Sequence, residues 1–144
     1  SNPNTGKHHT MLEPIDIPDS NYRAYVRRRL TVGQCEDMIL VNETWVMPSP
    51  ENVQSMRELQ ATIAIGIERF EHRTDDGTVS TSDEDWPPIL DTSDLTPFLK
   101  RVQYVRNNLD MREVGQFYRE VQSRLRIDEI AGNELGESSD TETP

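Results

Sequence analysis

Three groups of side chains in this sequence are of the types that catalyse reactions or hold metal ions. His8 and His9 are adjacent, but adjacent histidines do not converge on one ion without further ligands nearby. Cys35 has no histidine in its segment to activate it, and a cysteine outside disulfides is commonly a small buried hydrophobic residue. The acidic cluster at 83–85 lacks the ligand spacing of a calcium loop. We therefore expect no enzymatic activity, no catalytic residue, no cofactor and no metal site.

The remaining candidates are side chains that bind other proteins. Arg27, Arg28 and Arg29 form a basic run in an otherwise acidic chain. This run either docks an acidic partner segment or guards a strand edge with charge. Trp45 and Trp86 are the largest potential anchors, and Trp and Arg dominate hot spots where a contact desolvates them. We predict a protein-binding surface from these five residues, although burial in the domain is the favoured interpretation of Trp86.

Composition and charge restrict the classes of partner. The chain has 144 residues, a net charge of −11 and 33% hydrophobic residues. A phosphate backbone repels such a surface, which argues against nucleic acid as a direct partner. The single cysteine excludes an internal disulfide. No apolar run approaches the roughly 20 residues that cross a bilayer, and the amino terminus lacks a signal-peptide core. We expect a soluble intracellular protein with no membrane contact.

A helix predicted over Ser49 to Phe70 organises the rest of the chain. Ser49 can cap this helix, and Pro50 suits its first turn because that position needs no hydrogen-bonded amide. Apolar residues then recur at spacings of three and four, and small residues widen the stripe. We therefore expect the helix to be central and covered on more than one side. The stripe consists of Met56, Leu59, Ile63, Ile67 and Phe70.

Two shorter elements precede the central helix. The alternation from Tyr22 to Leu30 is typical of a half-buried strand. Thr31 and Gln34 have the spacing of a capping box, which predicts a helix that ends near Val41. This helix is expected to bury Cys35, Met38 and Ile39.

An acidic loop and two closing helices are expected after the central helix. Asp75-Asp76-Gly77 is a strong turn signal, although the sequence gives little support for a hairpin around it. Ser93 or Thr96 can cap the first closing helix, and Asp110 with Glu113 can cap the second. We expect both helices to pack antiparallel against each other and against the central helix. The interval 97–127 carries a net charge of +4, which we interpret as a solvated basic face.

These elements predict a mainly α fold. We expect one small helical domain over 22–127, with one N-terminal strand or small β element and an acidic loop over 71–91. Residues 1–21 are polar and lack apolar periodicity, so we expect a flexible N-terminal arm. Residues 128–144 contain six acidic residues and no basic one, which is typical of a disordered acidic tail.

The succession from Tyr25 to Gln34, YVRRRLTVGQ, resembles the opening of tailed-phage tail assembly chaperones. Proteins of that class often open with a basic strand that ends in Arg-Arg-Leu-Thr/Ser-x-Gly and enters a helix. A middle helix then runs into a polar segment, here Ile63 to Asp76. A stretch with Pro and Asp, here Trp86 to Thr96, precedes the closing helices. The resemblance covers roughly Tyr22 to Leu125 and is one of pattern and order.

The resemblance implies a non-enzymatic protein of phage tail morphogenesis. Such a protein binds the tape measure protein and tail tube subunits during virion assembly, in the host cytoplasm. Two alternatives stay open: a structural component of the phage particle, in the tail or head–tail region, and an acidic inhibitor or DNA mimic. A mimic needs ordered carboxylates on the folded surface, whereas more than half of the net charge here belongs to 128–144. The oligomeric state also stays open.

Overall fold

The computed structural model describes residues 13–27, 29–89 and 94–125. In these ranges the chain forms four α-helices, one π-helical turn and four strands. In chain order they are β1 (Glu13–Asp16), β2 (Tyr22–Val26), α2 (Val32–Val41), η1 (Asn42–Val46), α3 (Glu51–Gly66), β3 (Ile67–Thr74), β4 (Gly77–Ser80), α4 (Thr96–Asn108) and α5 (Met111–Leu125). His8, His9 and the predicted tail over 128–144 lie outside the described residues.

The four strands form one antiparallel sheet in the order β1-β2-β3-β4. The fold is therefore mixed α/β, and the prediction of a mainly α domain with one strand or small β element is wrong. Strand β1 accounts for part of the difference. It lies within 1–21, where a flexible arm was predicted, and its Ile15 and the nearby Ile17 are buried in the core. A four-residue strand is too short for its alternation to stand out from the sequence.

The central helix is shorter than predicted, because α3 ends at Gly66 and continues directly into β3. Ile67 and Phe70 are both buried although they lie three residues apart. The register explains this spacing: Tyr25 pairs with Arg69 and Val26 pairs with Ile67, so Glu68 is an extra residue on β3. Such a bulge shifts the alternation by one position, and it makes a strand imitate helical spacing.

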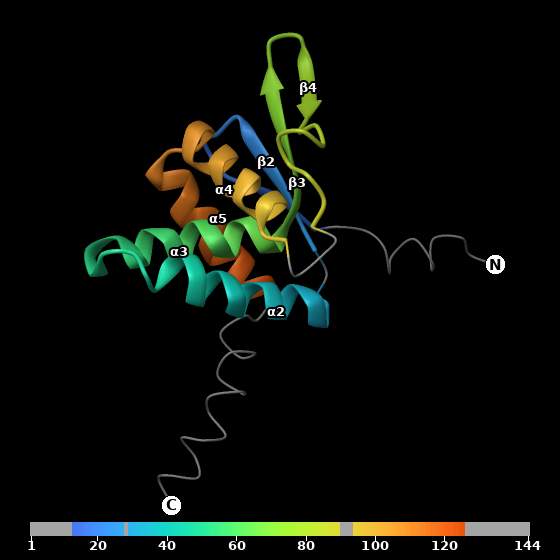
Figure 1. The fold of residues 1–144 in the computed structure, drawn as a ribbon. Coiled ribbons are helices and arrows are strands. Elements are labelled where there is room, and N and C mark those ends of the chain that lie inside the picture. Colours follow the sequence, from blue (N-terminus) through green and yellow to red (C-terminus); the bar gives the residue numbers. More distant parts are fainter. Residues whose placement is uncertain (1–12, 28, 90–93, 126–144) are drawn as a thin grey trace, which may run out of the picture.

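Helix α3 is central, as predicted. Figure 1 shows it between α2 and α4, and it also contacts α5. Two hydrophobic clusters meet on its C-terminal half, where Ile63 joins one cluster and Ala64 and Ile65 join the other. The first cluster fills the space between the sheet and α5 and contains Ala24, Val26, Phe70, Phe117 and Val121. The second cluster lies among α2, η1 and α4 and contains Val41, Val46, Phe98 and Val102.

Two capping predictions are confirmed, those at the starts of α2 and α5, whereas the predicted Ser49 cap of α3 is wrong because Pro50 occupies the N-cap and the Ser49 hydroxyl donates to the Val46 carbonyl. Helix α2 turns a different face inward than expected. Thr31 accepts from the Gln34 amide, while the Gln34 side chain accepts from the Thr31 amide. Asp110 and Glu113 exchange the same pair of bonds at the start of α5. The buried residues of α2 are Gln34, Asp37 and Val41, whereas Ile39 is 46% exposed. Neither predicted residue is the N-cap of α4: Leu95 holds that position without a capping side chain, Asp94 Oδ1 accepts from the Thr96 amide at 3.0 Å, and a proline lies in the first turn.

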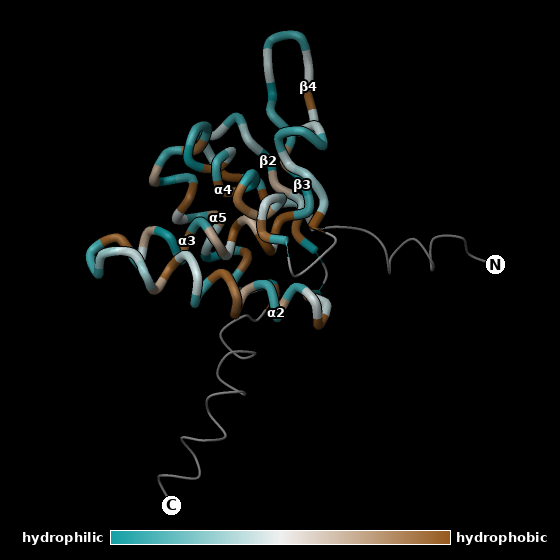
Figure 2. Tube along the Cα trace, viewed as in Figure 1, coloured by the Kyte–Doolittle hydropathy of each residue, from teal (hydrophilic) through white to brown (hydrophobic). Residues whose placement is uncertain are grey.

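A β-hairpin replaces the first half of the acidic loop predicted over 71–91. Strands β3 and β4 pair across the turn at Asp75 and Asp76, and Gly77 has a φ of 133°, which a side chain would oppose. The hairpin projects beyond the helices and is mostly hydrophilic (Figures 1 and 2). Every residue of β4 is exposed, including Val79. The hairpin is thus an arm of the sheet with little share in the core.

Gly66 allows α3 and α5 to approach closely, and we expect Gly66→Ala to strain this contact. A Cβ at this position would lie 2.3 Å from Val121 Cγ1 and 3.0 Å from Leu125 Cδ1. Overpacking of this kind should lower the free energy of unfolding by about 1–3 kcal/mol, measured by urea titration. In the double variant Gly66→Ala/Val121→Ala, the new methyl group occupies the space that valine vacates. The two costs should then be clearly less than additive, and strict additivity would contradict the proposed contact.

Candidate functional site

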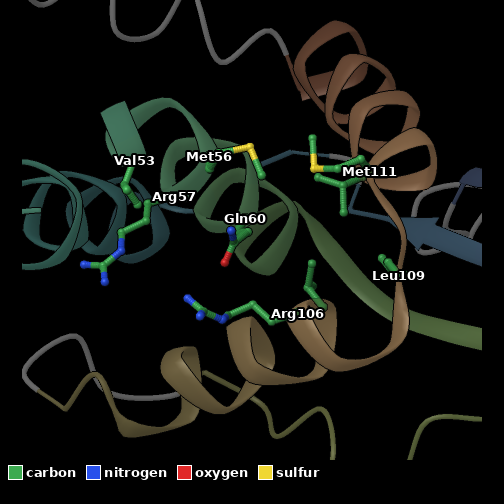
Figure 3. Close-up of a pocket in the computed structure, with 9 residues that line it drawn as sticks. Val53, Met56, Arg57, Gln60, Arg106, Leu109 and Met111 are labelled. Atoms are coloured by element: carbon green, nitrogen blue, oxygen red, sulfur yellow. The ribbon is translucent and has the colours of Figure 1, made fainter. Parts of the chain in front are cut away.

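In the part of the chain that the structure describes, a groove lies between α3 and α4 and is closed at one end by the start of α5. Its volume is about 360 Å³, which lies within the range of pockets that bury a small ligand or a few side chains. Figure 3 shows Gln60 and Arg106 pointing into the space between the two helices. The groove is lined by Val53, Met56, Arg57, Gln60, Val105, Arg106, Leu109, Met111 and Val114.

The groove combines an apolar lining with positive charge. Arg57 and Arg106 are its charged lining residues, and the lining contains no acidic side chain. In the view of Figure 3, both guanidinium groups lie toward one side of the opening, and Leu109 and Met111 lie toward the other. Among the described residues, no ion pair or hydrogen bond of Arg106 is recorded. In a chain with a net charge of −11, this groove is a site of opposite sign.

Two features of the groove lining leave room for a bound group: a buried hydrogen-bond acceptor and two exposed apolar side chains. Gln60 Oε1 is buried, and no described residue donates a hydrogen bond to it. Met56 and Met111 are 38% and 52% exposed. Met is flexible and polarisable, so it adapts to irregular apolar partners. The groove therefore offers a hydrogen-bond acceptor and a deformable apolar wall to an incoming group.

Trp45 contacts the groove indirectly, through the lining residue Arg57. The Arg57 guanidinium lies over the Trp45 ring, 4.7 Å from its centroid, and Arg57 Nη1 donates to the Trp45 carbonyl at 2.9 Å. The π-helical turn η1 carries Trp45, which is partly buried against the second cluster. Trp45 thus orients the Arg57 guanidinium, one of the two positive groups of the groove, through a cation–π contact.

The structure separates the predicted basic strand end from Trp45. Arg27 pairs with Glu68 at 2.8 Å, Arg29 is exposed, and Arg28 lies outside the described residues. The Arg27 amide donates to the carbonyl of Gly66 at the end of α3. Trp45 meets the same helix nine positions earlier, at Arg57, which is about 14 Å away along the axis. These residues therefore do not form one surface.

Trp86 is buried, which confirms the favoured interpretation and removes this residue from any partner surface. The residue is 3% exposed, and its indole nitrogen donates to the Ile67 carbonyl at 3.0 Å. The ring packs edge-on against Phe70, with centroids 5.0 Å apart. The apolar ring joins the core while its one donor is satisfied, so the residue fixes the chain after the hairpin to the α3–β3 junction.

Arg101 completes this junction, although the sequence placed it on a solvated basic face. It is 1% exposed and donates to the carbonyls of Ala64, Ile67 and Pro87 at 2.8, 3.1 and 2.8 Å. Burial lowers the pKa of its guanidinium to about 10. The guanidinium also lies 5.0 Å from the Trp86 ring centroid. Arg101 is a structural clamp, and it does not face the groove.

Sequence reasoning missed the groove itself. Its residues come from three helices, and the sequence of each helix alone predicts a different kind of surface. Met56 belongs to the predicted apolar stripe, while Arg106 belongs to the predicted basic face. The available signal was the length of the stripe: it begins at Met56, but only Thr62–Gly66 of α3 are buried. A stripe longer than its cover leaves apolar surface for a partner.

Other site classes find no support in the part of the chain that the structure describes. No cluster of three His, Cys, Asp or Glu side chains there could hold a metal ion. Within the same ranges, no helix combines the length and apolar character needed to cross a membrane. No family model matches the chain, and neither curated proteins nor solved structures give a match.

Proposed function

We propose that this protein is a non-enzymatic assembly chaperone of a phage tail. In this proposal it holds a helical segment of the tape measure protein in the host cytoplasm and presents it to tail tube subunits. The sequence resemblance from Tyr22 to Leu125 supports the class. The groove between α3 and α4 carries the proposal, because it is an apolar, positively charged recess that its own described residues leave open.

The chemistry of the groove defines the segment that it would receive. An amphipathic helix lays apolar anchors, spaced by three or four residues, into a groove of this kind. Carboxylates beside those anchors would meet Arg57 and Arg106, and such charge pairs govern the rate and the specificity of encounter. The Met side chains tolerate variation in the anchor, since they repack easily. The net charge of −11 would keep a complex with an aggregation-prone client soluble.

We expect Met56→Ser and Arg106→Glu to weaken binding of the tape measure protein. Each substitution removes one property of the groove, its apolar wall or its positive charge, and leaves the core intact. Each should reduce affinity about tenfold, which corresponds to about 1.4 kcal/mol. The measurement is co-expression of the tagged chain with the tape measure protein of the same phage. The soluble tape measure protein recovered on the tag is then quantified, and the Kd is measured on purified complexes.

Two matched controls separate the groove from general surface effects. Leu99→Ser changes an apolar residue of α4 that is 40% exposed, close to the 38% of Met56, but lies outside the groove. Arg119→Glu reverses a charge on the exposed side of α5. Equal losses in the groove variants and the controls would overturn the groove as the binding site. Finding the chain in purified particles, with no effect on soluble tape measure protein, would support a structural component instead.

A further inference from the structure

The groove between α3 and α4 requires an occupant that is both apolar and acidic. Met56 and Met111 leave 38% and 52% of their surfaces exposed beside it. Arg57 and Arg106 supply positive charge without an acidic lining residue to match it. An apolar side chain flanked by carboxylates would satisfy both requirements at once, because it would cover the Met side chains and place its charges near the guanidinium groups.

The segment 128–144 of the same chain has this chemistry. It contains six acidic residues and no basic one, so its charge is opposite to that of the groove. Its large aliphatic residues, Ile130 and Leu135, each follow a carboxylate directly, Glu129 and Glu134. A carboxylate beside an aliphatic side chain is the combination that the groove lacks.

The segment is also long enough to reach the groove. Helix α5 ends at Leu125, whose Cδ1 would lie 3.0 Å from a Cβ at Gly66. Along α3, the groove residues Gln60 and Val53 lie about 9 and 20 Å back from Gly66. At about 3.3 Å per extended residue, Leu135 can reach about 33 Å from Leu125. This reach covers the whole groove.

We propose that the segment 128–144 docks into the α3–α4 groove of its own chain. Leu135, together with Ile130, covers the Met side of the groove, and the neighbouring carboxylates lie beside Arg57 and Arg106. A tether this short gives an effective concentration in the millimolar range, so even a weak contact is populated. The pairing is electrostatic in part, so salt weakens it.

Methionine methyl NMR of the full chain tests this docking. Carbon-13 labelling of the methyl groups reports Met56 and Met111 in the groove, and Met38 and Met47 away from it serve as internal references. In the full chain with Ile130→Ser/Leu135→Ser, the Met56 and Met111 signals should move, while those of Met38 and Met47 stay in place. Arg106→Glu and a rise from low to high salt should each move the Met111 signal in the same direction.

Four further outcomes are decisive. The control Ser138→Ala/Ser139→Ala, in the same segment, should leave all four signals unchanged. Unmoved Met56 and Met111 signals in the Ile130/Leu135 variant would overturn the proposal. Equal movement of all four signals would also overturn it, because a general change of fold would then be the cause. Signals that depend on protein concentration would assign the groove to a second copy of the chain instead.

The docking stands on the groove and the segment alone, but its consequence rests on the proposed function. A docked segment would compete with the tape measure protein, so the Ile130→Ser/Leu135→Ser variant should bind this client more tightly than the unmodified chain. NMR is recorded on the protein without a client. Failure of the docking therefore appears in the spectra, whereas failure of the proposed function appears only as absent client binding.

Discussion

Ile63→Asp should abolish the stable fold or lower its free energy of unfolding by more than about 4 kcal/mol. Ile63 is fully buried on α3 and belongs to the cluster between the sheet and α5. The substitution removes this apolar side chain and buries a carboxylate among the hydrocarbon groups of the cluster. The measurement is urea unfolding, followed by far-UV circular dichroism and by fluorescence of the two Trp residues.

Two variants bracket this result. Ser55→Asp adds the same carboxylate at an exposed position of α3, so it should change stability by no more than about 0.5 kcal/mol. Ile63→Val removes one methyl group from the same core position and should cost about 0.5–1.5 kcal/mol. An unfolding curve of Ile63→Asp that coincides with that of the unmodified protein would show that α3 is not the centre of the core.

Arg101→Met should lower the free energy of unfolding by about 3–5 kcal/mol. Methionine has a similar length, so packing against Trp86 is largely kept, but the hydrogen bonds to Ala64, Ile67 and Pro87 are lost. The Ile67 carbonyl keeps the Trp86 indole as a donor, whereas a buried carbonyl left without a donor, as at Ala64 and Pro87, costs about 1–3 kcal/mol. The gain from no longer burying a guanidinium offsets part of this sum. The same urea titrations measure the effect.

The neighbouring Lys100→Met is the matched control, because Lys100 is exposed on the same turn of α4. It should change stability by less than about 0.5 kcal/mol. Arg101→Lys tests the geometry, since a single ammonium group cannot reproduce the planar fork that reaches three carbonyls. If Arg101→Met were as stable as the Lys100 control, the junction between α3 and β3 would be held by packing alone.

Much of the local structure could be predicted because neighbouring residues determine it. The capping pairs Thr31–Gln34 and Asp110–Glu113 and the turn before Gly77 follow from short-range hydrogen bonds and from allowed backbone angles. The fold class could not be predicted in the same way. Ile67 and Phe70 continue the helical spacing only because a bulge at Glu68 shifts the strand, and the bulge depends on pairing with β2, a distant part of the chain.

The candidate site was predictable only at Trp45. Its place beside the groove comes from stacking with Arg57, which lies twelve residues away and was not singled out. Arg101 and Arg106 illustrate the limit of charge patterns. They lie five residues apart on one helix, yet one is buried as a clamp and the other lines the groove. Their different roles depend on which helix faces pack against α3, and such packing is not written into the local sequence.

The uninterrupted passage from α3 into β3 has a mechanical consequence. Arg101 and Trp86 both hold the carbonyl of Ile67, so the joint between helix and strand is stiff and has no loop to absorb movement. The groove lies on the helical side of this joint, and the projecting hairpin lies on the other. At about 3.3 Å per residue, the eight residues of β3 extend about 26 Å from this joint toward the tip of the hairpin. The helix that lines the groove and the strand that forms the hairpin are therefore one continuous, rigidly joined segment of the chain.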